Sequence, residues 1–99
     1  AASGVAAWTP EGIFAALTEG RTAVDLAEGL QLRRARVMGV ERIELSGFSD
    51  GMRDRLRAYG LFSEIISWKL RFFVPVDATG PAILAKVLDK YPIERVAER

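Results

Sequence analysis

Residues Glu64 to Val76 alternate large apolar side chains with other residues, and this pattern constrains the fold more than any other in the chain. The apolar positions are Ile66, Trp68, Leu70, Phe72, Val74 and Val76. Because successive side chains of a β-strand point to opposite faces, the segment is predicted to form one long, half-buried strand. Its solvent face would carry Lys69, Arg71 and Phe73. The β-branched and aromatic residues at this spacing exclude a helix.

Three helices are predicted from capping signals and apolar stripes. The first begins at the Thr9 cap with Pro10 in its first turn, and it covers about residues 10–19. A second amphipathic helix starts at Ser49-Asp50 and ends at Gly60. The last begins at Gly80-Pro81 and stops before Pro92.

Shorter extended segments precede the long strand. Alternation from Thr22 predicts a short strand, and residues 30–37 and 40–45 predict a hairpin around Met38-Gly39 with one solvent-exposed face. We expect a disordered start at residues 1–7 and a frayed tail at residues 94–99. The predicted fold class is therefore α+β, with a three- or four-stranded mainly antiparallel sheet and about three helices on one face, in the order α-β-β-β-α-β-α.

The composition limits the chemistry that this chain can perform. It has no histidine and no cysteine, which removes the commonest zinc ligands and the Cys-His and Ser-His-Asp catalytic arrangements. No glycine-rich phosphate loop is present, and the pairs Glu41 with Glu44 and Asp50 with Asp54 fit solvated or capping roles better than acid-base catalysis. We therefore expect no catalytic residue, metal or cofactor in this chain.

Length and hydropathy indicate one small domain outside the membrane. The 99 residues suit a single domain over 1–99, and no apolar run approaches the roughly 18 residues of a spanning helix. The absence of cysteine is compatible with the reducing cytoplasm, where we expect the protein to act. Because the first residue is not methionine, we expect the chain to be a fragment of a longer protein.

A basic centre is the best candidate for a binding surface. Residues 30–76 carry nine basic and five acidic side chains, a local charge of +4. The candidate nucleic-acid-binding residues are Arg33, Arg34, Arg36, Arg42, Lys69, Arg71 and Phe73. On neighbouring strands these cations would bind a phosphate backbone while Phe73 stacks a base. In the alternative, Glu41, Glu44 and Glu64 pair with the same arginines and form an ordinary salt-bridged face.

One family resemblance covers most of residues 30–93. The segment GLFSEIISWKLRFFVP at 60–75 is similar to a region near the C-terminus of large bacterial strawberry notch-like methylase/helicase proteins. The preceding LQLRRARVMGVERIELSGF and the following ATGPAILAKVLDKYPI also resemble that region.

The resemblance implies a role in DNA processing with the chemistry elsewhere. Members of that family combine an adenosylmethionine-dependent methyltransferase module with an ATP-dependent helicase module, and the motifs of neither occur in this chain. The expected function is a noncatalytic accessory domain that positions DNA or docks onto those catalytic modules. The alternative is a protein-interaction module without nucleic-acid affinity. A salt series separates them, since phosphate contacts weaken with added salt.

Overall fold

The computed structural model describes residues 8–20 and 22–98. The helices are α1 (Pro10–Thr18), α2 (Arg53–Ala58) and α3 (Gly80–Lys90), and short 3-10 turns cover Ala27–Gly29 and Asp50–Met52. The strands are β1 (Thr22–Leu26), β2 (Gln31–Val37), β3 (Val40–Ser46), β4 (Phe62–Ile66), β5 (Lys69–Val74) and β6 (Ile93–Glu98).

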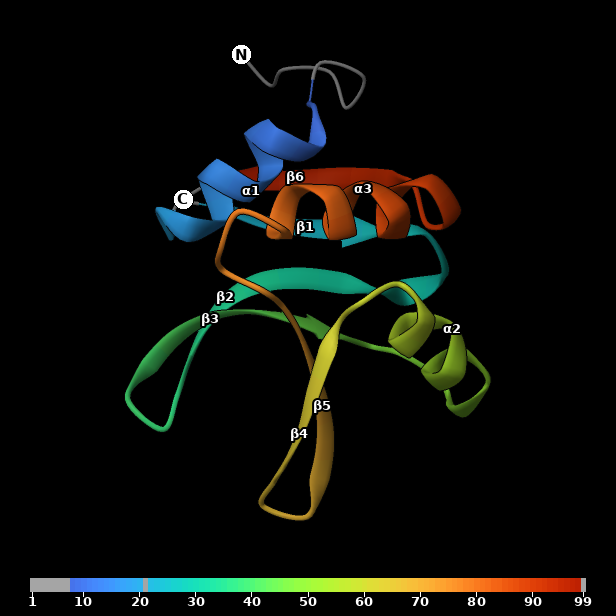
Figure 1. Cartoon of the computed structure of the whole chain (residues 1–99). Coiled ribbons are helices and arrows are strands. Elements are labelled where there is room, and N and C mark those ends of the chain that lie inside the picture. The colour runs from blue at the N-terminus through green and yellow to red at the C-terminus, as the bar shows by residue number, and fades with distance from the viewer. Residues whose placement is uncertain (1–7, 21, 99) are drawn as a thin grey trace.

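The strands form one antiparallel sheet in the order β4-β5-β3-β2-β1-β6 (Figure 1). The predicted α+β class with about three helices is confirmed, whereas three or four strands was too few, because the sheet has six. One additional strand arises because residues 64–76 contain a turn, and the other is β6 in the tail of the chain.

The predicted long strand at 64–76 is a hairpin. β4 and β5 are joined by Ser67 and Trp68, whose φ angles of 52° and 67° are both left-handed. A two-residue turn with this backbone matches the twist of the flanking strands. It usually contains Asn-Gly, Asp-Gly or Gly-Gly, so the residues Ser67 and Trp68 did not indicate a turn. The chain reverses here, and Trp68, predicted on the buried face, is 98% exposed.

The tail that was predicted to fray is an ordered edge strand. β6 pairs with β1, with Val24 opposite Val96 and Leu26 opposite Ile93. Ile93 and Val96 pack against the core, and this burial favours the ordered strand over a frayed end. Arg99 and the start predicted to be disordered at residues 1–7 lie outside the described residues.

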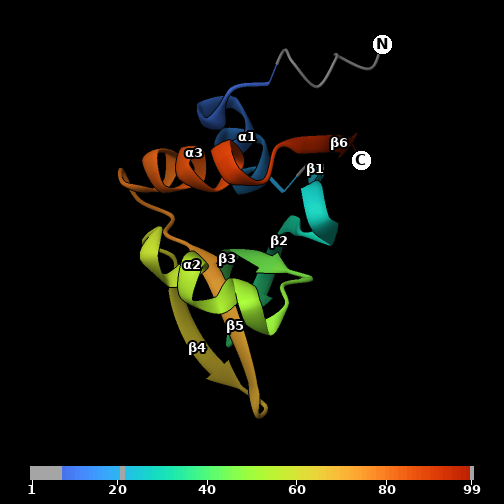
Figure 2. The same ribbon diagram turned by 90° about the vertical axis from the view of Figure 1, so that its right-hand side faces the viewer.

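All three helices pack on the same face of the sheet, as predicted. Their buried side chains belong to one cluster with the inward-facing side chains of β1, β2, β3 and β5. The members of the cluster on the helices are Ile13, Leu17, Leu56, Leu84 and Val87. Figure 2 shows α1 and α3 at one end of the molecule and the β4–β5 hairpin projecting from the other. No helix in residues 8–20 and 22–98 is long and apolar enough to cross a membrane.

The start of α3 supplies a pH-dependent contact. Asp77 Oδ1 accepts hydrogen bonds from the Thr79 backbone N–H at 2.8 Å and the Thr79 hydroxyl at 2.5 Å. The bonds from Thr79 lower the pKa of Asp77 from its ordinary value. A lowered folded-state pKa means that this stabilisation is present at neutral pH and is lost as the pH falls through the folded pKa.

We therefore expect D77A to lower the Tm at pH 7, with a smaller difference from the parent protein at pH 3. Thermal unfolding followed by circular dichroism at both pH values measures the difference. D77N is the control, because its amide oxygen still accepts the hydrogen bonds but does not titrate in this range. An equal difference for D77A at pH 7 and pH 3 would show that the Asp77 charge contributes nothing.

Candidate nucleic-acid interface

A cleft opens where β3 and β5 diverge. The two strands pair only from Ile43 opposite Val74 to Leu45 opposite Phe72. After Ser46 the chain leaves the sheet through Gly47, whose φ is +82°. β5 continues toward the hairpin turn, where Lys69, Leu70 and Arg71 pair with β4 alone. The resulting cleft has a volume of about 460 Å³, within the range of ligand sites.

Cations outnumber carboxylates among the residues that line the cleft. Its charged side chains are Arg53, Lys69, Arg71 and Glu44. Arg71 Nε lies 4.0 Å from Glu44 Oε2, and Arg53 Nη2 lies 3.1 Å from Asp50 Oδ1. Within the part of the chain that the structure describes, Lys69 has no ion-pair partner. Three cations against one lining carboxylate leave the cleft electropositive.

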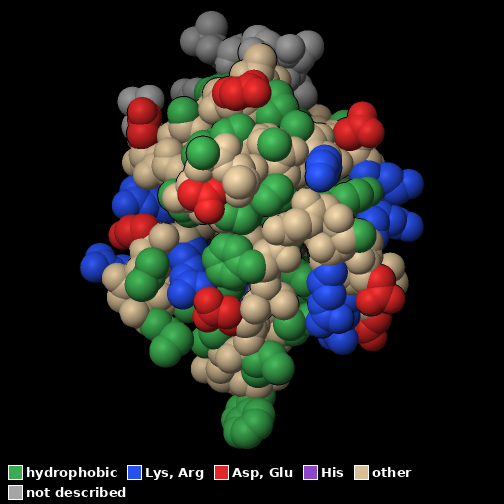
Figure 3. All heavy atoms as spheres, viewed as in Figure 1, with side chains coloured by type: hydrophobic (Ala, Val, Ile, Leu, Met, Phe, Trp, Pro, Cys, Tyr) green, Lys and Arg blue, Asp and Glu red, His purple; other side chains and the backbone are tan. Residues whose placement is uncertain are grey.

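Trp68 lies in the turn at the tip of the β4–β5 hairpin. Trp68 is among the residues that line the cleft and is 98% exposed, so burial in the core does not explain its presence. Its left-handed backbone costs about 1–2 kcal/mol for a residue other than glycine. Figure 3 shows the end of the β4–β5 hairpin as a protruding hydrophobic feature. This unfavourable backbone conformation presents a large aromatic side chain to solvent, which makes Trp68 a candidate binding residue.

Of the predicted site residues, Lys69 and Arg71 lie in the cleft, whereas Phe73 and Arg42 do not. Phe73 was predicted to be accessible on the wet face, but it is fully buried although its side chain points away from the helices. The Arg42 guanidinium covers it, 5.0 Å from the ring centroid, and also contacts the Phe62 ring at 5.6 Å. Arg42 is ion-paired with Glu64, so neither Arg42 nor Phe73 can stack a base without rearrangement.

The structure places the arginines of the β2–β3 hairpin on both faces of the sheet. Arg33 is opposite Glu44 on the helix-free face, while Arg34 and Arg36 are opposite Ile43 and Glu41 on the helix-covered face. Adjacent residues of a strand point to opposite faces of the sheet, so Arg33 lies on the other face from Arg34 and Arg36. Together with Glu41 they line a second hollow beside Gly20.

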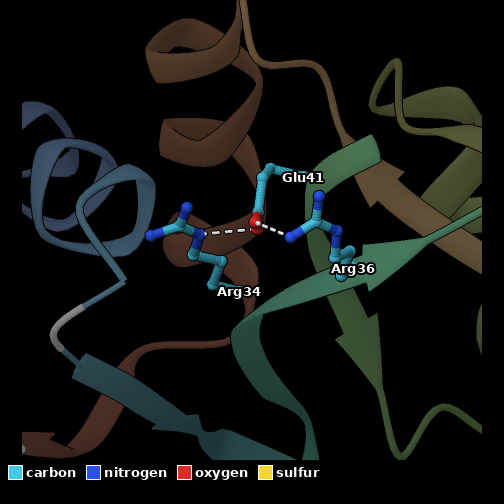
Figure 4. A network of polar contacts seen from close by, with 3 residues as sticks. All are labelled: Arg34, Arg36 and Glu41. Atoms are coloured by element: carbon cyan, nitrogen blue, oxygen red, sulfur yellow. Dashed lines mark hydrogen bonds and ion pairs between the residues drawn. The ribbon is translucent and has the colours of Figure 1, made fainter. Parts of the chain in front are cut away.

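Cross-strand ion pairs of the kind expected in the salt-bridged alternative are present. Arg34 Nε donates to Glu41 Oε2 at 2.8 Å, as Figure 4 shows, and this bond lowers the pKa of Glu41. With the Arg42–Glu64 and Arg71–Glu44 pairs, these contacts partly neutralise the basic centre. Among the candidate cations in the described residues, Arg33 and Lys69 are the two without an ion-pair partner.

Sequence reasoning missed several lining residues, among them Trp68, Arg53, Phe48 and Ser46. Phe48 contacts Phe72 edge-on, with ring centroids 4.9 Å apart, and this contact brings the 47–53 segment beside β5. Such contacts join residues far apart in the chain and leave no local pattern.

Comparison with protein-family models, curated proteins and solved structures finds no match to this chain. Among residues 8–20 and 22–98, no group of three or more acidic side chains is placed to hold a metal ion.

Proposed function

We propose that this chain is a noncatalytic accessory domain that positions single-stranded nucleic acid in the cleft between β3 and β5. The observation that carries the proposal is the placement of Lys69 and Arg71 beside the fully exposed indole of Trp68. Binding of single strands without sequence preference combines a basic groove for the backbone with aromatic platforms for the bases. This cleft contains both components.

Each lining group has a role in the proposal. Lys69, Arg71 and Arg53 contact phosphates, and Trp68 stacks on a base, which is worth about 1–3 kcal/mol. Glu44 holds Arg71 on the floor of the cleft through the contact at 4.0 Å. The resemblance of residues 60–75 to strawberry notch-like proteins makes DNA the proposed strand, and it assigns the chemistry to methyltransferase and helicase modules outside this chain.

Fluorescence anisotropy of labelled single- and double-stranded DNA, at low and at physiological salt, tests the proposal. Contacts to three phosphates predict a slope of about −2 for log K against log salt, which is about 20-fold weaker binding between 50 and 200 mM salt. We expect the single strand to bind more tightly, because only its bases are free to stack on Trp68. No binding at either salt concentration would overturn the proposal.

A docking role is the second candidate, and the apolar tip of the hairpin favours it. Ile65 is 73% exposed near Trp68, and an exposed apolar pair of this kind suits a contact with a neighbouring catalytic module. Absence of DNA binding, together with salt-insensitive association with such a module, would establish docking instead.

A further inference from the structure

The second hollow gathers two arginines, Arg34 and Arg36, around one carboxylate. Its volume is about 250 Å³, and its charged lining residues are Arg33, Arg34, Arg36 and Glu41. Glu41 bridges two of them, with Oε2 accepting from Arg34 Nε at 2.8 Å and Oε1 lying 3.7 Å from Arg36 Nη1 (Figure 4). The carboxylate therefore orients two guanidinium groups that strand geometry alone would leave mobile.

The charge of the hollow is not balanced by its own lining. One ionised carboxylate faces two guanidinium groups, because the Arg33 side chain lies on the opposite face of the sheet. The hydrogen bond from Arg34 lowers the pKa of Glu41, so the Glu41 carboxylate stays ionised at neutral pH. The bond to Glu41 occupies Arg34 Nε, while each guanidinium has five N–H donors in a planar fork. Several donors remain for an anion with oxygens in a complementary arrangement.

Arg34 is held in place from a second side. Gly20 has a φ of +72°, and the Arg34 guanidinium occupies the space that a Cβ atom at Gly20 would need. The side chain therefore lies between the backbone of Gly20 and the carboxylate of Glu41. Fixing an arginine before the ligand arrives reduces the entropy that binding costs.

We propose that this hollow is a phosphate-binding site, separate from the cleft between β3 and β5. A dianionic phosphate group accepts hydrogen bonds from Arg34 and Arg36 while Glu41 keeps both side chains oriented. Inorganic phosphate and the terminal 5′-phosphate of a strand share this chemistry. The site does not depend on the nucleic-acid cleft and remains even where DNA does not bind there.

The test is an NMR titration of the labelled protein with inorganic phosphate at constant ionic strength. We expect saturable shifts of the Arg34 Nε–Hε signal and of the amides of residues 33–36. The variant R36Q removes one exposed cation, and the Arg36 side chain is 70% exposed, so the fold is retained. Loss of charge-assisted contacts predicts at least about tenfold weaker phosphate binding.

Two comparisons make the result decisive. R57Q removes the same charge from α2, outside the hollow, and should bind phosphate like the parent protein. R34K keeps the charge but loses the planar fork, and we expect weaker binding. Tighter binding of 5′-phosphorylated than of 5′-hydroxyl oligothymidylate would make the strand terminus the source, and equal binding would make free phosphate the source. Non-saturating shifts, or equal affinity in R36Q and the parent, would overturn the site.

Discussion

Reversing the two β5 charges in the cleft, in K69E/R71E, is expected to weaken single-stranded DNA binding at least about 100-fold. Each lost charge-assisted contact is worth about 1.5–3 kcal/mol, and each new carboxylate repels a phosphate. Only Arg53 then remains of the lining cations, so the slope of log K against log salt falls from about −2 to about −0.7. Anisotropy across a salt series measures both quantities.

Controls for this variant separate binding from folding. The carboxylate that replaces the Arg71 guanidinium would face Glu44 and the cross-strand Glu64, so unfolding must be measured in parallel. E44R/R71E exchanges the partners, keeps the pair and the charge of the cleft, and should retain most of the affinity. K86E/K90E places the same charge change on α3, away from the cleft, and should bind like the parent. Unchanged affinity in folded K69E/R71E would eliminate the cleft as the DNA site.

The turn variant S67N/W68G is expected to fold more stably and to bind DNA less well. Ser67 and Trp68 both have left-handed backbones, which glycine adopts without cost and asparagine at lower cost than serine. We expect a gain of about 1–2 kcal/mol in the free energy of unfolding. Because Trp68 is almost wholly exposed, its removal costs no burial. Loss of the stacked base weakens binding by about 5- to 150-fold.

Urea unfolding and DNA titration of the same preparations test the two effects together. The single variant S67N relieves part of the turn strain and keeps the indole, so it should gain stability without losing affinity. A lower stability for S67N/W68G would show that the indole supports the fold. Unchanged DNA affinity would remove Trp68 from the proposed interface.

Elements with local signals were predictable from the sequence. Thr9 caps α1, where its hydroxyl accepts from the Gly12 N–H at 3.0 Å, and Met38-Gly39 forms the β2–β3 turn with φ angles of 53° and 80°. The Ser67-Trp68 turn has the same backbone but no residue that favours it, so alternation on both sides was taken for one strand. β6 was missed because its few apolar residues follow Pro92 in a charged segment, and pairing with β1 supplies its order.

The site was less predictable than the fold, for a geometric reason. Lys69 and Arg71 belong to a local pattern, and both line the cleft. Arg53 and Phe48 lie in the cleft because β3 diverges from β5 after Leu45. This arrangement depends on packing between segments that are distant in the sequence. For Phe73 the face of the sheet was predicted correctly, but the exposure was not. Arg42 and Phe62 cover its ring.

The most direct test of the central proposal uses the fluorescence of Trp68. In a W8F background Trp68 is the sole indole of the chain, and its emission reports contact with a base. Titration with oligothymidylate is expected to quench the emission, with the same affinity as anisotropy and the same weakening by salt. DNA binding that leaves Trp68 emission unchanged, or no binding at low salt, would contradict a nucleic-acid role for the cleft.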